Sequence, residues 1–75
     1  MEIYHNGFII RPIITQSNGV FSSSVVIRET DGTQQVHESI GRFASLEAAK
    51  LFAVNWALAS INGAPAPKPP FRMMQ

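Results

Sequence analysis

The fold is decided by one stretch, which reads Ser17-Asn18-Gly19-Val20-Phe21-Ser22-Ser23-Ser24-Val25-Val26-Ile27-Arg28-Glu29-Thr30-Asp31-Gly32-Thr33. Asn-Gly and Asp-Gly pairs supply the positive φ angles of tight hairpins, so a turn is expected at each end. The residues between the turns alternate between two faces of a strand, with Phe21, Val25 and Ile27 on one and Ser22, Ser24, Val26 and Arg28 on the other. The stretch therefore predicts the central strand of an antiparallel meander.

Working outward, we expect strands over residues 8–16, 20–30 and 34–43. In the first, Phe8, Ile10 and Ile14 are expected to face the core, which leaves Ile9, Arg11, Ile13 and Thr15 on the open face. Pro12 has no N–H to donate, so it belongs on an edge. His5-Asn6-Gly7 is a further turn signal, which allows a short extra strand from Glu2 to Tyr4.

The third strand of the meander breaks its own alternation. Val36 and Ile40 share one phase, and Phe43 has the opposite one. A bulge or turn near Gly41 is therefore expected to re-aim Phe43.

One helix is expected after the strands. Eleven of the thirteen Val and Ile residues lie in residues 1–44, whereas all three Leu and five of the eight Ala lie in residues 45–62. Ser45 is a good N-cap for a helix beginning at Leu46, and Asn62-Gly63 is a good stop. The predicted fold is α+β, with a three-stranded meander and one helix in a domain over residues 1–63, followed by an extended Pro-rich tail over residues 64–75.

The predicted helix has apolar residues on two sides. One broad face carries Leu46, Ala49, Phe52, Ala53, Trp56, Ala57 and Ala59, and a second stripe carries Leu51, Val54, Leu58 and Ile61. Because one small sheet is expected to cover only the first face, we interpret the second stripe as a protein interface. Three alternatives remain open: a second copy or partner covers it, the tail covers it through Phe71, Met73 or Met74, or it stays partly exposed.

The open face of the sheet is the alternative site, for nucleic acid. It is predicted to carry Arg11, Thr15, Ser22, Ser24, Arg28 and His37. Residues 1–44 contain three Arg against Glu2, Glu29, Asp31 and Glu38, which gives a net charge of −1. Nucleic-acid binders usually present a basic stripe, so the charge argues against this alternative.

The residue types argue against catalysis, metals and cofactors. There is no Cys, and His5 and His37 have no metal-ligand spacing. The three consecutive serines, Ser22 to Ser24, lack a nucleophile elbow, and no Gly-rich phosphate loop occurs. Without cysteine, a signal-peptide pattern or a long apolar run, we expect a cytoplasmic protein with no membrane contact.

The order of elements resembles the three-stranded sheet and helix of integrase amino-terminal domains and ethylene-response DNA-binding domains, and also parts of double-stranded RNA-binding domains and HicB-type antitoxins. A closer likeness is to small uncharacterised bacterial proteins, domains of unknown function, on the stretches Tyr4-His5-Asn6-Gly7-Phe8-Ile9-Ile10-Arg11-Pro12 and Phe43-Ala44-Ser45-Leu46-Glu47-Ala48-Ala49-Lys50-Leu51-Phe52-Ala53. The likeness implies this fold and a bacterial origin, and it implies no activity. The sequence thus predicts a non-catalytic interaction module, with nucleic-acid binding as the alternative.

Overall fold

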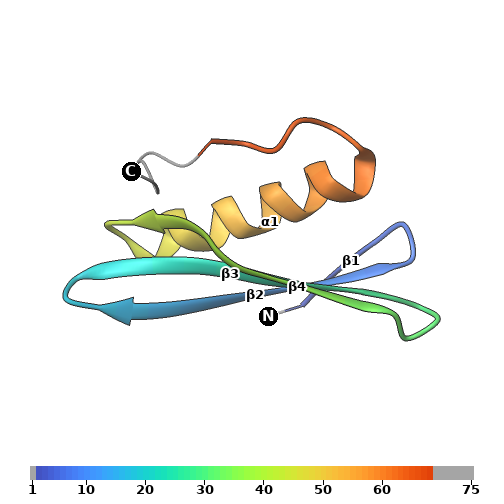
Figure 1. Cartoon of the computed structure of the whole chain (residues 1–75), viewed down its shortest axis with the longest axis horizontal. Helices are drawn as coiled ribbons and strands as arrows, with labels where there is room; N and C mark the ends of the chain where they lie inside the picture. The colour runs from blue at the N-terminus through green and yellow to red at the C-terminus, as the bar shows by residue number, and fades with distance from the viewer. Residues whose placement is uncertain (1, 69–75) are drawn as a thin grey trace.

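An open antiparallel sheet forms one layer of the protein, and a single helix lies across one face of it (Figure 1). The computed structural model describes residues 2–68. The strands are β1 (Ile3–His5), β2 (Phe8–Ser17), β3 (Val20–Glu29) and β4 (Gln34–Phe43), in the spatial order β1-β2-β3-β4, and the helix is α1 (Leu46–Asn62). The predicted α+β meander is confirmed, and so is the short additional strand before it. Of the predicted Pro-rich tail, the structure describes only residues 64–68, which follow the helix without regular structure. The rest of the tail lies outside the described residues.

The tight turns have the backbone that their sequences predict. Asn6 and Gly7 have φ angles of 49° and 81°, and Asn18 and Gly19 have 53° and 76°. Positive φ at both central residues is the signature of type I′ hairpins, whose twist matches that of the strands they join. Between β3 and β4, the Thr33 N–H donates to Asp31 Oδ1 at 2.8 Å, and this bond holds the pKa of Asp31 below its ordinary 3.8.

The predicted bulge is present in β4, but the prediction that it re-aims Phe43 is wrong. Ser23 pairs with Gly41 and Val25 pairs with His37, so the segment 38–40 lies opposite Ser24 alone. Ser39 takes a φ of 54° there, and its N–H donates to Ser24 Oγ at 3.2 Å. Because three residues replace one, the alternation after the bulge is the same as before it, and Phe43 lies on the covered face in phase with His37. Ile40, inside the bulge, is the side chain that leaves this alternation and packs on the core.

The helix begins and ends where the sequence predicts. The Ser45 hydroxyl accepts a hydrogen bond from the Ala48 N–H at 3.2 Å, and Gly63 closes the helix in the left-handed region at a φ of 71°. The buried residues of α1 are Ala49, Phe52, Ala53 and Ala57, which pack on Ile10, Val25, Ile27 and Phe43 of the sheet. Small alanines let the helix lie close to the strands.

That close approach is visible in one hydrogen bond. Ser23 is fully buried at the centre of the sheet, and its hydroxyl donates to the Ala49 carbonyl at 2.6 Å. Within residues 2–68, every buried side-chain nitrogen or oxygen has a hydrogen-bond partner. The helix is therefore tied to the sheet by a polar contact as well as by apolar packing.

Both edges of the sheet are poorly suited to adding another strand. β1 pairs only with Phe8–Ile10 of β2. Residues that flank a two-residue turn form a hydrogen-bonded pair, and such pairs recur at every second residue. Ile10 therefore directs its backbone groups away from β3 and toward β1, and Pro12 directs its own to the same side, beyond the end of β1. Pro12 has no N–H to offer there, and the bulge interrupts β4 on the other edge. Prolines and bulges are the devices by which natural sheets protect their edges.

Candidate interaction face on the open sheet

The sheet face that points away from α1, here called the open face, carries much of the exposed apolar surface. The large hydrophobic side chains exposed within residues 2–68 are Tyr4, Ile13, Val36, Leu46 and Leu51. The first three are on the open face, at 72%, 41% and 52% exposure. Register places there Tyr4, Ile9, Arg11, Ile13, Thr15, Ser22, Ser24, Val26, Arg28, Gln34, Val36 and Arg42, all joined in cross-strand pairs.

Arginines alternate with apolar residues across this face. Arg11 lies between Ile9 and Ile13 along β2 and opposite Val26 on β3, while Arg28 lies opposite Ile9. Side chains in such directly opposed and diagonal positions are within reach of one another. The methylene stems of the arginines can therefore pack on their apolar neighbours while the guanidinium groups stay in water.

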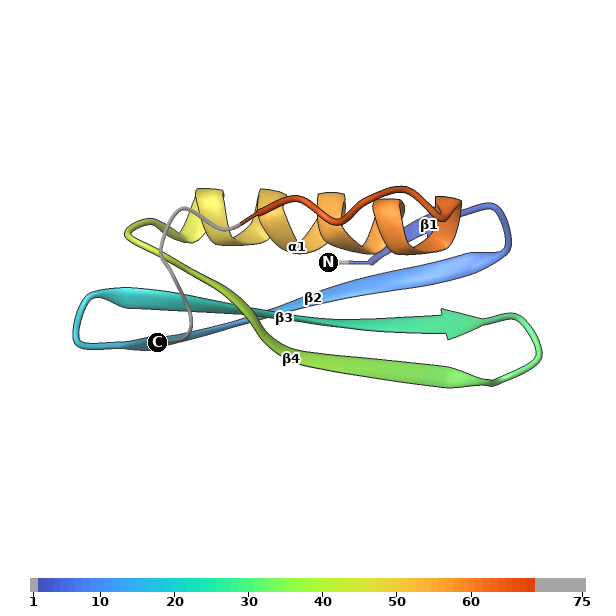
Figure 2. The same cartoon turned by 45° about the horizontal axis from the view of Figure 1, so that its top comes forward.

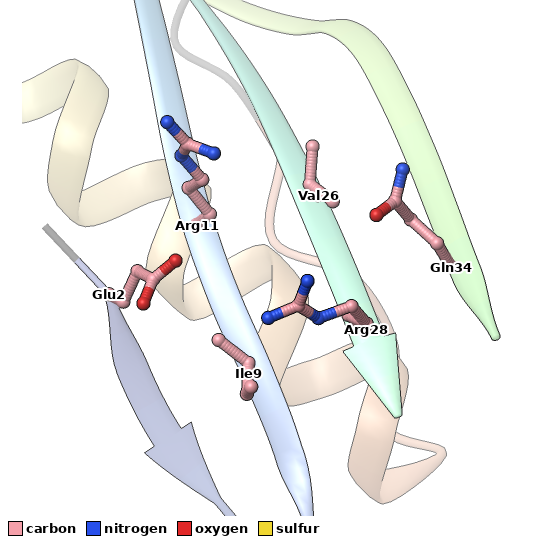
Figure 3. Close-up of a pocket in the computed structure, with 6 residues that line it drawn as sticks. All are labelled: Glu2, Ile9, Arg11, Val26, Arg28 and Gln34. Atoms are coloured by element: carbon pink, nitrogen blue, oxygen red, sulfur yellow. The ribbon is translucent and has the colours of Figure 1, made fainter. Parts of the chain in front are cut away.

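A shallow hollow of about 40 Å³ lies at the middle of this pattern. Its lining residues are Glu2, Ile9, Arg11, Val26, Arg28 and Gln34 (Figure 3). Figure 3 shows Arg11 rising from β2 and Arg28 from β3 on the same side of the sheet, with the Glu2 carboxylate beside β2. Small-molecule pockets begin at about 300 Å³, so the hollow suits a single functional group of a larger partner. Two guanidinium groups beside it favour a carboxylate or another planar anion.

The charge of the open face differs from the charge of the strands as a whole. Arg11, Arg28 and Arg42 all lie on it, against Glu2 at its edge and Glu38 in the bulge, so three positive and two negative charges leave +1. Glu29 pairs with Phe8 on the other face, and Asp31 lies in the turn. The value of −1 for residues 1–44 therefore does not describe this surface.

Five of the six residues predicted for the open face are on it: Arg11, Thr15, Ser22, Ser24 and Arg28. His37 is not, and that prediction is wrong. His37 pairs with Val25 on the covered face, and its ring centroid lies 4.6 Å from that of Trp56. The error came from giving Val36 and Ile40 the same phase, because Ile40 lies inside the bulge and packs on the core, whereas Val36, before the bulge, is on the open face.

The sequence reasoning did not single out Tyr4, Val36 and Arg42 as site residues. Tyr4 lies on the open face because β1 pairs it with Ile9 of β2. The signal in the sequence that could have indicated this was a Tyr close to an Asn-Gly turn. Val36 and Arg42 lie on opposite sides of the bulge and share a face because its two extra residues preserve the alternation. No local pattern in the sequence indicates how many residues that bulge contains.

The second helical stripe is not one continuous exposed surface. Leu51 is 63% exposed and Val54 is half-buried, but Leu58 and Ile61 pack against the same core cluster as Ile3 and Phe8. The extra strand β1 widens the sheet at this end of the helix. The interpretation that the sheet covers only one side of α1 is therefore corrected for the last turns of the helix.

Within residues 2–68 there is no group of three His, Cys, Asp or Glu side chains able to hold a metal ion. No helix within these described residues is long and apolar enough to cross a membrane. Comparison of the chain with protein-family models, curated proteins and solved structures finds no match.

Proposed function

We propose that the protein is a non-catalytic interaction module whose open face binds a protein segment with apolar side chains flanked by carboxylates. The observation that carries the proposal is the sharing of one face by Tyr4, Ile13 and Val36, all exposed, with Arg11, Arg28 and Arg42. Aromatic residues and arginine are the types enriched where proteins meet. The protected sheet edges support a face, and not an edge, as the contact surface.

Carboxylates in the partner follow from the arginines. A guanidinium presents paired N–H donors that match the two oxygens of a carboxylate, and such pairs are stronger than neutral hydrogen bonds. Around the hollow, Arg11 and Arg28 offer this geometry beside Ile9 and Val26, which provide the apolar floor. A partner with Leu, Ile or Val flanked by Glu or Asp complements both features.

The partner is a different protein and not a second copy. A face-to-face pair of identical chains sets three arginines of one open face against three of the other, and opposed like charges are costly. The second helical stripe has weaker support as the main interface, since two of its four residues, Leu58 and Ile61, already pack against the core.

Nucleic-acid binding by the open face is the second candidate, and the clustering of the three arginines is the observation that favours it. Its support is weaker because the face has a net charge of only +1, and because Ile9, Ile13, Val26 and Val36 interrupt the arginines. A surface that binds through phosphates usually presents a basic patch or stripe of several cations.

The two candidates are separated by titrating isotope-labelled protein with three probes and following the backbone amide resonances. The probes are an amphipathic peptide of Leu and Glu, the same peptide with Lys in place of Glu, and a duplex DNA. The Glu peptide is expected to shift resonances of open-face residues of β2 and β3, and the Lys peptide is not. Equal binding of both peptides, or shifts confined to α1, would refute the proposal.

A charge-reversal pair of variants sharpens the test. Arg28→Glu is expected to weaken binding of the Glu peptide about tenfold, which corresponds to about 1.4 kcal/mol. Lys68→Glu makes the same change of charge outside the sheet and is expected to leave the affinity unchanged. If DNA binds instead, with a steep salt dependence that Arg28→Glu reduces, the nucleic-acid candidate replaces the protein partner.

A bacterial origin and a cytoplasmic location belong to the same proposal. The first rests on the resemblance of the Tyr4–Pro12 and Phe43–Ala53 stretches, and the second on the absence of cysteine from the sequence.

A further inference from the structure

The remaining exposed large hydrophobic residues, Leu46 and Leu51, lie in the first turns of α1, at 40% and 63% exposure. Beside Leu46 is a hollow of about 250 Å³ between the helix and β2, lined by Pro12, Ile14, Leu46 and Lys50. Three of these four residues are apolar, and the fourth contributes methylene groups. The hollow therefore has room for one or two apolar side chains.

The chain that follows the helix turns back along it. Gly63 in the left-handed region reverses the direction, and the Ala64 N–H donates to the Ala59 carbonyl at 2.8 Å. Figures 1 and 2 both draw the orange-to-red segment after α1 running back beside the helix, toward its amino-terminal end, on the side away from the sheet. Pro67 in this segment is half-buried, which indicates contact with the rest of the protein.

The length of chain after Lys68 is sufficient to reach the hollow. A helix of 17 residues is about 26 Å long at ~1.5 Å per residue. Residues 64–68 cover about 16 Å of the return path at ~3.1 Å per residue, leaving about 10 Å to the first turn of α1. The next seven residues extend up to about 22 Å at the same rise.

We propose that Phe71–Met74 of this same chain occupies the hollow and covers Leu46. This segment lies outside the described residues, and its sequence is Phe71-Arg72-Met73-Met74. Phe71 supplies a large apolar side chain, and the unbranched methionines can fill an irregular gap. Compared with a second copy or another protein, the tail has the advantage of its short tether, because such a link gives an effective concentration in the millimolar range.

Methyl NMR of the full chain tests this contact. Nuclear Overhauser effects are expected from the methyl groups of Met73 and Met74 to those of Ile14 and Leu46. Changing Phe71, Met73 and Met74 together to Ser is expected to shift the Ile14 and Leu46 methyl resonances. The resonance of Ile13, on the opposite face of the same strand, serves as the internal reference and is expected to stay in place. The matched variant Arg72→Ser alters the same segment without removing an apolar side chain, and is expected to leave all three resonances unchanged.

Two results would overturn the inference. The first is that the triple Ser variant leaves the Ile14 and Leu46 resonances where they are. The second is that the Overhauser effects occur only between differently labelled molecules in a mixed sample, which assigns the hollow to a second copy. Because the core clusters consist of residues from the strands and α1, the triple variant is expected to remain folded. Its peptide binding through the open face is expected to be unchanged, so the two proposals fail independently.

Discussion

Replacing Gly41 with alanine is expected to lower the free energy of unfolding by about 1–2 kcal/mol. A Cβ atom at this position would lie 2.8 Å from Cε2 of Phe43 and 2.9 Å from Cε2 of Phe52. Carbon atoms at optimal separation are about 3.5–4.0 Å apart, so one of the rings must move. Both rings are buried, and their centroids are 4.9 Å apart, which leaves little space for that movement.

Two opposing terms decide the magnitude. Overpacking of a close-packed core costs about 1–3 kcal/mol. Alanine regains about 0.5–1 kcal/mol relative to glycine, because it loses less conformational entropy on folding. The net loss is a modest part of the roughly 4–11 kcal/mol expected for a domain of 75 residues, so the variant still folds.

Urea denaturation followed by fluorescence of Trp56, the single Trp, measures this loss. The midpoint is expected to fall with an unchanged slope, and the melting temperature to fall by about 4–8 °C per kcal/mol. Adding Phe52→Leu removes one of the clashing rings, so the double variant is expected to lose less than the sum of the two single losses. If Gly41→Ala is as stable as the parent, the gain in conformational entropy offsets the cost of overpacking, and the argument that packing dominates is wrong.

Three further predictions concern single side chains. Ser23→Ala is expected to cost about 1 kcal/mol in the same urea assay, because it removes the buried hydrogen bond to the Ala49 carbonyl; an unchanged midpoint would contradict this. Asp31 has its pKa lowered by hydrogen bonds from Thr33, so its contribution to stability is present above pH 3.8 and is lost as the pH falls through its folded value. The difference in stability between the parent and Asp31→Asn is therefore expected to shrink below about pH 3.8, and a difference independent of pH there would refute the assignment. Gly63→Ala is expected to cost about 1 kcal/mol through backbone strain alone, since its φ is 71° and a Cβ would meet nothing within 4 Å; thermal unfolding should show a smaller loss for Gly63→Asn.

Local sequence was sufficient for most of the fold because the signals involved act over a few residues. Asn6-Gly7 and Asn18-Gly19 determined the two type I′ hairpins through their positive φ angles. Ser45 and Gly63 determined the ends of α1 through capping. Alternation in residues 8–28 placed Arg11 and Arg28 on the open face, since the turn between these strands fixes their register.

The candidate site needed contacts between residues that are distant in the sequence. His37 was misplaced and Arg42 was not singled out, because the phase of β4 was taken from Ile40, which packs on the core from inside the bulge. Its size is set by how β4 packs against β3 and α1, and neighbouring residues in β4 do not encode it. The tertiary structure also showed that Glu29 and Asp31 lie off the open face, which changed the sign of the charge there.

The sequence by itself determined the order of elements, the turn types, the helix ends and the identity of one sheet face over β2 and β3, all through the conformational preferences of adjacent residues. Only the tertiary structure decided which surfaces stay uncovered. Exposure depends on what packs above each side chain, and here Leu58 and Ile61 pack against the core while Leu51 stays in solvent. The three arginines and three exposed apolar residues of the open face likewise meet only when four strands are in register.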